Sequence, residues 1–122
     1  MVEARRGLGN QGEALAAKYL KQRGYRILAQ QWQARLWGEI DIIAKEGKVF
    51  VFVEVKTRQG GEFGYPEEAV TREKQKKLAQ LATYYLARHR LEEHPHRLDV
   101  ISIELDRGSP KITHWKDILL EE

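Results

Sequence analysis

Apolar residues recur along the chain in two rhythms, one typical of helices and one typical of strands. Residues 12–23 carry apolar side chains three to four positions apart, and Gly24 follows as a stop signal. Residues 71–91 repeat the same spacing over a longer stretch. The apolar stripe of this second helix is Leu78, Leu81, Ala82, Tyr85 and Leu86. The pattern therefore predicts one helix near the start of the chain and a longer one past its middle.

Five stretches favour strands instead. Residues 25–32 alternate loosely and predict an outer strand, whereas residues 38–44 and 49–56 are nearly continuous apolar runs. The polar break between those two runs contains Gly47, which predicts an antiparallel hairpin. Residues 97–105 predict another core strand and residues 111–115 a short last one. The order α-β-β-β-α-β-β predicts one α/β domain over residues 1–122, with a central mixed sheet flanked by helices.

The strand VFVFVEVK, residues 49–56, ends in two charges although its beginning suits a strand covered on both faces. Side chains alternate across a strand, so Glu54 and Lys56 share the face of Phe50 and Phe52. A structural interpretation is that the pair lies in water at the strand's end as a weak surface ion pair. The preceding strand favours a functional interpretation of the pair.

That preceding strand, GEIDIIA, carries Asp41 in its middle, on the face of Glu39 and Ile43 and opposite to Ile40. If the hairpin closes around Gly47, Asp41 and Glu54 lie nearly opposite each other on adjacent strands. Two like charges in an apolar sheet repel unless a cation lies between them, and Mg²⁺ is held by one or two carboxylates with water and phosphate oxygens. An ammonium at Lys56 can orient water and stabilise charge on a phosphate, which suits metal-assisted phosphodiester hydrolysis.

On these residues the sequence resembles a known family. GEIDIIA followed by VFVEVKTR is similar to the core of the YraN-like uncharacterised family and, more broadly, of restriction-endonuclease-like nucleases. The resemblance spans nearly the whole chain, from the GxxGE pattern at Gly9 through RLDVISI. It implies a restriction-endonuclease-like fold in which Asp41 and Glu54 coordinate Mg²⁺ or Mn²⁺ and Lys56 assists the water. The superfamily usually has Pro before the Asp, where this chain has Ile40.

Glu13 has two interpretations. It falls in the first turn of the expected helix, where the helix dipole stabilises an acid without any function. Archaeal Holliday junction resolvases, which the sequence also resembles, have a Glu on their first helix, and that likeness implies that Glu13 is a third acid near the metal. Junction resolvases cut symmetric strands as dimers, so the likeness implies a homodimer, although the sequence itself leaves the oligomeric state open.

Cations at Arg58, Arg72, Lys74 and Lys77 are candidates for nucleic-acid contacts. Three of them lie at the start of the second helix, where a helix N-terminus and nearby cations attract phosphates. The alternative is a solvated helix surface. The Gly-rich residues 59–66 are either a flap, with Phe63 or Tyr65 stacking on a base, or a linker.

Other polar and aromatic residues favour structural roles. Asp99, central in an apolar strand, is expected to be a buried hydrogen-bonded partner of a basic residue. The four histidines lack zinc-site spacing. The tryptophans at positions 32, 37 and 115 are expected to pack.

Composition narrows the partners. The net charge of +3 and isoelectric point near 9.2 favour an anionic partner. The chain has no cysteine, no apolar run long enough for a membrane span and no signal-peptide core, so a cytoplasmic protein is expected. DNA is the favoured substrate. A non-catalytic nucleic-acid-binding or adaptor protein on the same scaffold is the competing hypothesis, and a nuclease acting on RNA differs only in its substrate.

Overall fold

The computed structural model describes residues 2–59, 71–105 and 108–118. For residues 2–8 it describes the backbone alone. Two helices, α1 (Val2–Gln22) and α2 (Arg72–Arg88), accompany five strands. The strands are β1 (Arg26–Gln33), β2 (Glu39–Glu46), β3 (Val49–Gln59), β4 (His96–Leu105) and β5 (Lys111–Trp115). The element order and the mixed sheet confirm the predicted α/β class.

The five strands form one sheet in chain order, β1-β2-β3-β4-β5. Three neighbouring pairs are antiparallel, and β3 and β4 are parallel, joined by the crossover that contains α2. The predicted hairpin is confirmed, since Glu46 pairs with Val49 and Gly47 has a φ of 59°, which suits the tight turn. The expectation that the first strand is an outer one is confirmed as well.

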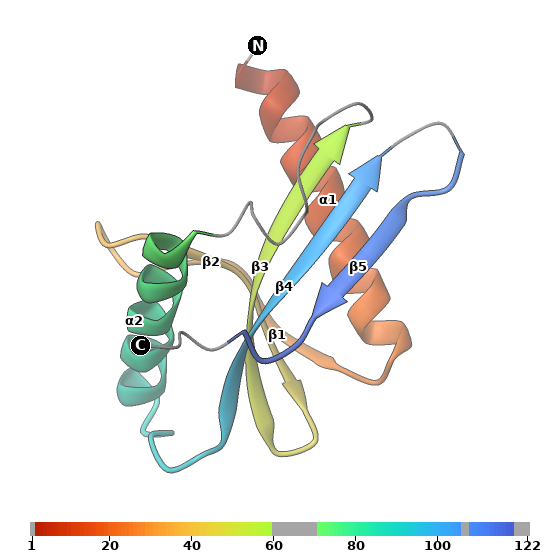
Figure 1. The fold of residues 1–122 in the computed structure, drawn as a ribbon. Helices are drawn as coiled ribbons and strands as arrows, with labels where there is room; N and C mark the ends of the chain where they lie inside the picture. The colour runs from red at the N-terminus through yellow and green to blue at the C-terminus, as the bar shows by residue number, and fades with distance from the viewer. Residues whose placement is uncertain (1, 60–70, 106–107, 119–122) are drawn as a thin grey trace.

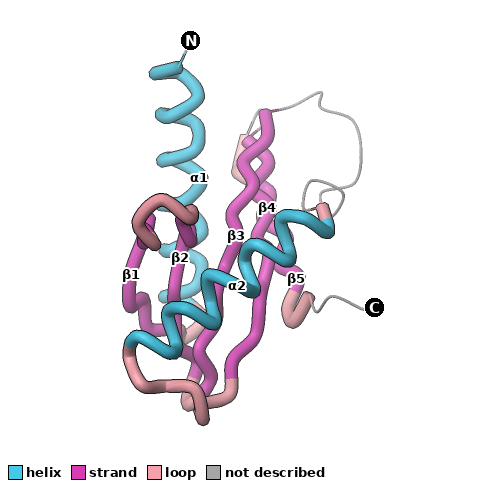
Figure 2. The backbone as a smooth tube through the Cα atoms, turned by 90° about the vertical axis from the view of Figure 1, so that its left-hand side faces the viewer, coloured by secondary structure: helices cyan, strands magenta, loops and turns pink. Residues whose placement is uncertain are grey.

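Helices α1 and α2 cover opposite faces of the sheet (Figures 1 and 2). Alternation along β3 sends Val51, Val53 and Val55 into a core under α1, and Phe50 and Phe52 into a core under α2. The predicted apolar stripe of α2 is confirmed, because all five of its residues are buried. Strand β3 is thus covered on both faces along its first half, as its apolar sequence requires.

Several predicted boundaries were wrong. Helix α1 begins at Val2 rather than residue 12. The sequence pattern missed its first turns because they lack the apolar spacing that packing on a sheet imposes. Glu13 therefore lies mid-helix, and the dipole argument for it does not apply. Strand β3 continues to Gln59, and α2 ends at Arg88 instead of residue 91. The proposed flap with Phe63 and Tyr65 lies outside the described residues.

Two predictions about single side chains also need correction. Ile40 packs in the α2 core with Ile43, whereas Ile42 packs in the α1 core, so strict alternation fails around Asp41. Trp37 is 58% exposed because it lies in the β1–β2 turn rather than in a strand. Trp32, by contrast, packs edge-on against Tyr85 as expected.

Helix α1 approaches β3 most closely at Gly12. A Cβ at this position would overlap the Thr57 side chain, whereas a Cβ at Gly9, one helical turn earlier, would have no atom within 4 Å. Because Glu13 follows Gly12 directly, this close approach fixes how near the Glu13 carboxylate lies to β3.

We expect Gly12→Ala to lower the free energy of unfolding by about 1–3 kcal/mol through overpacking against Thr57. Gly9→Ala is the matched control and should be neutral or slightly stabilising, since it only improves helix propensity. Urea unfolding measures both, and Thr57→Ala should partly rescue Gly12→Ala. Equal effects of the two glycine substitutions would contradict this account.

Candidate active site

The acidic residues converge where β2 separates from β3. The last register pair before the separation is Ile42 with Val53, and one step further the same register places Asp41 opposite Glu54. Here a side chain takes the place of a backbone acceptor: the Val55 amide donates to Asp41 Oδ2 at 2.8 Å. The predicted proximity of Asp41 and Glu54 is thereby explained by the end of a hairpin ladder.

Three elements contribute side chains to one surface hollow of about 410 Å³ at this separation. Asp41 comes from β2, Glu54 and Lys56 come from β3, and Glu13 comes from α1. The remaining lining residues are Gly9, Val55 and Thr57. All four residues predicted for metal binding or catalysis therefore line the same hollow.

The carboxylates of this hollow hold their protons unusually well. Burial raises the pKa of Glu54 to about 7, and repulsion from Asp41 adds to the shift, while Lys56 and Lys74 oppose it. Burial raises the pKa of Asp41 as well, although the hydrogen bond from the Val55 amide counteracts part of it. The pKa of Glu13 is raised by burial and then by the charge of Asp41. These three acids are thus short of positive charge.

Lys56 shows the opposite shift. Burial and the neighbouring Lys74 lower the pKa of Lys56, and the charges of Glu54 and Asp41 only partly compensate. An amine with a lowered pKa gives up its proton more readily than a solvated lysine does. The electrostatic influence of Lys74 on both Glu54 and Lys56 also shows that the start of α2 lies close to the acids.

The other predicted phosphate contacts lie on β3 and α2, and they are not among the residues that line this hollow. Thr71 caps α2 by accepting a hydrogen bond from the Lys74 amide at 3.2 Å, and Arg72 is the first helical residue. Arg58 lies two positions beyond Lys56 on β3 and so on the same strand face. Lys77 lies one helical turn beyond Lys74 and lines a different hollow.

Sequence reasoning missed Gln31. This residue has a φ of 50°, a conformation uncommon for a residue other than glycine, in the middle of β1 and opposite Asp41 in the β1–β2 register. Its Nε2 donates to Asn10 Oδ1 at 3.0 Å and to Glu13 Oε2 at 3.4 Å. Backbone strain of this kind costs about 1–3 kcal/mol and gathers at functional sites. Gln31 holds the Glu13 carboxylate toward the acids, and no apolar pattern could have indicated it.

The residues of the hollow suit a hard divalent cation. Glu13 Oε1 is buried and has no hydrogen-bond partner among the described residues, and the donors are carboxylate oxygens, the ligands Mg²⁺ and Mn²⁺ prefer. In the described part of the chain, no group of three or more His, Cys, Asp or Glu side chains is arranged to hold a metal ion together. Mg²⁺ commonly keeps several waters and needs only one or two carboxylates, so the hollow fits it.

Asp99 behaves as predicted and is not part of this hollow. It is fully buried and accepts hydrogen bonds from Arg97 Nε at 3.0 Å and from the Asp117 amide at 2.9 Å, with His114 Nε2 at 2.8 Å. Burial alone would raise the pKa of Asp99, but the hydrogen bonds from His114, Asp117 and Arg97 lower it. A carboxylate satisfied in this way has no need of a metal.

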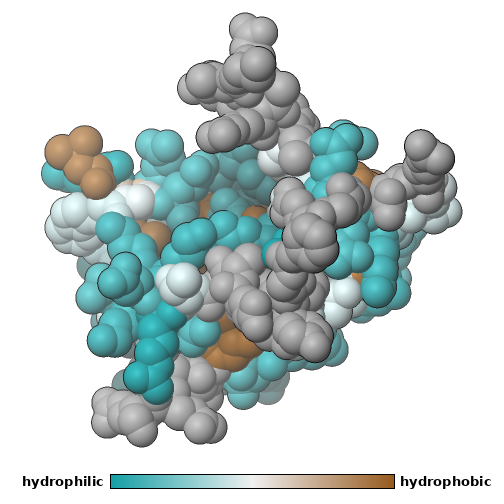
Figure 3. All heavy atoms as spheres, turned by 45° about the horizontal axis from the view of Figure 1, so that its top comes forward, coloured by the Kyte–Doolittle hydropathy of each residue, from teal (hydrophilic) through white to brown (hydrophobic). Residues whose placement is uncertain are grey.

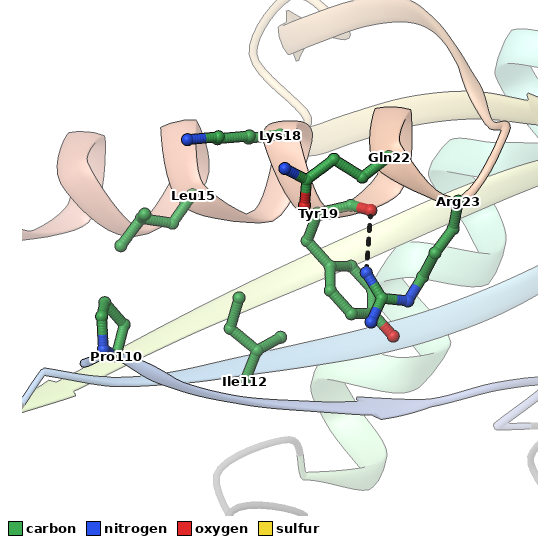
Figure 4. A pocket seen from close by; sticks show the side chains of 7 residues that line it. All are labelled: Leu15, Lys18, Tyr19, Gln22, Arg23, Pro110 and Ile112. Atoms are coloured by element: carbon green, nitrogen blue, oxygen red, sulfur yellow. Dashed lines mark hydrogen bonds between the residues drawn. The ribbon is translucent and has the colours of Figure 1, made fainter.

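A further hollow, of about 350 Å³, lies between α1 and β5 (Figure 4). Arg23 covers the Tyr19 ring, with its guanidinium carbon 3.8 Å from the ring centroid, and donates to the Tyr19 carbonyl at 3.4 Å. No acid lines it. The acids at the β2–β3 separation therefore remain the candidate active site.

Comparison with known proteins identifies the family. Residues 12–103 match the model of the uncharacterised protein family UPF0102, and the chain belongs to this family. A UPF0102 protein of Symbiobacterium thermophilum is 52% identical over 99 residues, covering 81% of this chain and 83% of its own. One from Caldicellulosiruptor saccharolyticus is 46% identical, with coverage of 84% and 86%. One from Herpetosiphon aurantiacus is 40% identical, with coverage of 99% and 100%. The predicted membership of a YraN-like uncharacterised family is thereby confirmed.

The raised pKa of Glu54 predicts a pH-dependent effect of Glu54→Gln on stability. The folded protein keeps the Glu54 proton up to about pH 7, whereas an unfolded chain releases it near 4.5, so the wild type loses stability between these values. Without divalent ions, Glu54→Gln should therefore raise the free energy of unfolding at pH 8 by about 1–3 kcal/mol and leave it unchanged at pH 4. Urea unfolding in a chelator at both pH values measures this.

The exposed Glu92, for which the same substitution removes only a solvated charge, supplies the control. Glu92→Gln should change stability at neither pH. A Glu54→Gln variant that is less stable than the wild type at pH 8 would show that the carboxylate is already compensated within the protein.

Proposed function

We propose that this protein is a Mg²⁺- or Mn²⁺-dependent endonuclease that hydrolyses phosphodiester bonds, with DNA as the favoured substrate. The observation that carries the proposal is the shared hollow: Glu13, Asp41, Glu54 and Lys56 come from three elements and line one opening at the sheet. A restriction-endonuclease-like fold, suggested by the sequence resemblance, is consistent with the mixed sheet and its two helices.

Asp41 and Glu54 would hold the metal, and Glu13 would be a third acid near it, since its buried Oε1 has no hydrogen-bond partner among the described residues. When bound, Mg²⁺ or Mn²⁺ supplies Lewis-acid stabilisation of the phosphate and makes water a better nucleophile. The elevated pKa values of the three acids mean that their protons must leave before the carboxylates can bind a cation. Metal affinity should consequently rise with pH.

Lys56 would act on the attacking water and on the phosphate. Because its pKa is lowered, its amine can take a proton from water, and its protonated form can hydrogen-bond the phosphate oxygens as their charge grows. The amide of Val55 keeps Asp41 in place through its 2.8 Å hydrogen bond. Gln31 holds Glu13 in a similar manner.

Lys74 and the α2 N-terminus would position the nucleic-acid backbone. Lys74 already lies close enough to influence Glu54 and Lys56, so a phosphate over the hollow would meet it. Arg58, Arg72 and Lys77 extend this positive surface. Such contacts fix the register of a nucleic acid without selecting its sequence.

Cleavage of a labelled panel tests the proposal. Single strand, duplex, flap and four-way junction, each as DNA and RNA, are incubated with Mn²⁺, and we expect cleavage of at least one. Asp41→Asn and Glu54→Gln should lower the rate at least about 10²-fold with the fold intact, and Glu92→Gln should retain it. Absence of cleavage despite binding of the panel would favour the non-catalytic, adaptor-like alternative.

Calorimetric titration with Mn²⁺ provides the second arm of the same test. The wild type should bind Mn²⁺ and release protons near pH 6, because the acids exchange protons for the cation. Asp41→Asn should weaken binding at least about tenfold. A wild type that binds neither Mn²⁺ nor Mg²⁺ would exclude the nuclease function.

A further inference from the structure

The turn between β1 and β2 exposes two large apolar side chains side by side. Leu36 is 100% exposed and Trp37 is 58% exposed, and they are the exposed large hydrophobic residues of the described part of the chain. Figure 3 shows one group of apolar atoms projecting from an otherwise mostly hydrophilic edge. Single exposed apolar residues are ordinary on protein surfaces, but an adjacent pair beside a hollow is not.

The turn has internal hydrogen bonds and contacts α2. The Ala34 amide donates to the Gly38 carbonyl at 2.9 Å, and the Trp37 amide donates to the Ala34 carbonyl at 2.9 Å. Gly38 has a φ of 142°, and a Cβ there would lie 3.0 Å from Lys77 Cε. The Trp37 ring rests edge-on against Tyr84, with centroids 5.0 Å apart. Trp37 therefore contacts α2 through one edge while more than half of its surface stays exposed.

Beside these two side chains lies a hollow of about 490 Å³, lined by Leu36, Trp37, Lys77, Gln80 and Leu81. Its volume lies within the roughly 300–1,000 Å³ typical of small-ligand sites. An aromatic ring and two leucines offer stacking and apolar contact, Gln80 offers an amide for hydrogen bonds, and Lys77 offers a charge. This combination matches a nucleobase attached to a phosphate.

The hollow also adjoins the candidate active site. Lys77, on its rim, follows Lys74 by three residues, so the two cations are neighbours on the surface of α2. Lys74 in turn influences Glu54 and Lys56. Trp37 precedes Asp41 by four residues, which an extended chain spans in at most about 14 Å. At about 3.4 Å per nucleotide, that distance corresponds to four nucleotides or fewer.

We propose that the Leu36–Trp37 hollow binds one unpaired nucleobase of the substrate, within about four nucleotides of the phosphate at the acidic site. The base stacks on Trp37, and Lys77 contacts the adjoining phosphate. The inference rests on the proposed nuclease function and narrows its substrate to nucleic acids with an unpaired nucleotide near the cut. A second copy of the chain fits less well, because a stable interface buries about 800 Å² per partner and two side chains fall far short.

Binding without catalysis tests the inference. Fluorescence anisotropy in a chelator compares a duplex carrying one unpaired nucleotide with the same duplex carrying an abasic residue at that position. Base stacking of about 1–3 kcal/mol corresponds to about 5- to 150-fold tighter binding of the intact substrate by the wild type. Trp37→Ala should reduce this ratio to about one, and Trp37→Phe should largely retain it.

Lys77→Ala separates the charge contribution from stacking. It should weaken binding of both substrates equally and reduce the dependence of affinity on salt by about one phosphate contact. Lys111→Ala, an exposed lysine on β5, is the matched control and should change neither quantity. Unchanged thermal unfolding of each variant confirms that the fold is intact.

The outcomes distinguish this inference from the function on which it rests. Equal binding of intact and abasic substrates, together with Mn²⁺-dependent cleavage, would overturn the nucleobase site and leave the nuclease proposal standing. Retention of the preference by Trp37→Ala would overturn the site too. Failure of the wild type to bind any nucleic acid would overturn both. A dimer in sedimentation that Trp37→Ala converts to monomer would reassign the hollow to self-association.

Discussion

The rest of the site depends on one hydrogen bond, in which the Asp41 carboxylate accepts the Val55 amide where the backbone pairing of β2 and β3 ends. Strands β2 and β3 pair from the turn up to Ile42 and Val53, and beyond that point the Asp41 carboxylate accepts the Val55 amide. A buried amide without a partner is costly, so the chain must supply an acceptor wherever the strands part. The acceptor here is a carboxylate, which brings negative charge into a half-buried opening. That opening admits Glu13 from α1 and Glu54 from β3.

Asp41 and Asp99 lie in the same sheet, but their pKa values shift in opposite directions. Asp99 is surrounded by Arg97, His114 and the Asp117 amide, and its pKa falls although burial opposes this. Arg97 further contacts Glu46 at 2.9 Å and the Tyr25 hydroxyl at 2.7 Å, so the network around Asp99 joins β4 to β2 and to the connection between α1 and β1. Among the described residues, the β2–β3 separation shows no comparable set of donors: Asp41 accepts a hydrogen bond from the Val55 amide, and burial still raises the pKa of Asp41.

Sequence patterns predicted those parts of the fold in which packing imposes a regular spacing of apolar residues. The hairpin, the α2 stripe and the face of Glu54 follow from alternation and helical spacing, because buried faces impose those periods. The sequence of the first turns of α1 lacks the apolar spacing of a packed helix, so this part of the helix was missed. The left-handed backbone of Gln31 and the exposure of Trp37 arise from particular contacts of single residues, which no periodicity records. The family resemblance correctly placed Glu13 beside the other acids, whereas the sequence pattern wrongly placed it in the first turn of its helix.

The irregular course of β1 bears on how copies of the protein can meet. β1 is an edge strand, and its pairing with β2 shifts register between Ile27 and Ala29 before reaching the left-handed Gln31. A regular edge presents evenly spaced amides and carbonyls to which a foreign strand can add, and bulges or kinks spoil that template. The backbone distortion that orients Glu13 through Gln31 thus also guards this edge against continuous sheet formation between molecules. The same local irregularity thus orients Glu13 at the acidic opening and makes the β1 edge a poor template for aggregation.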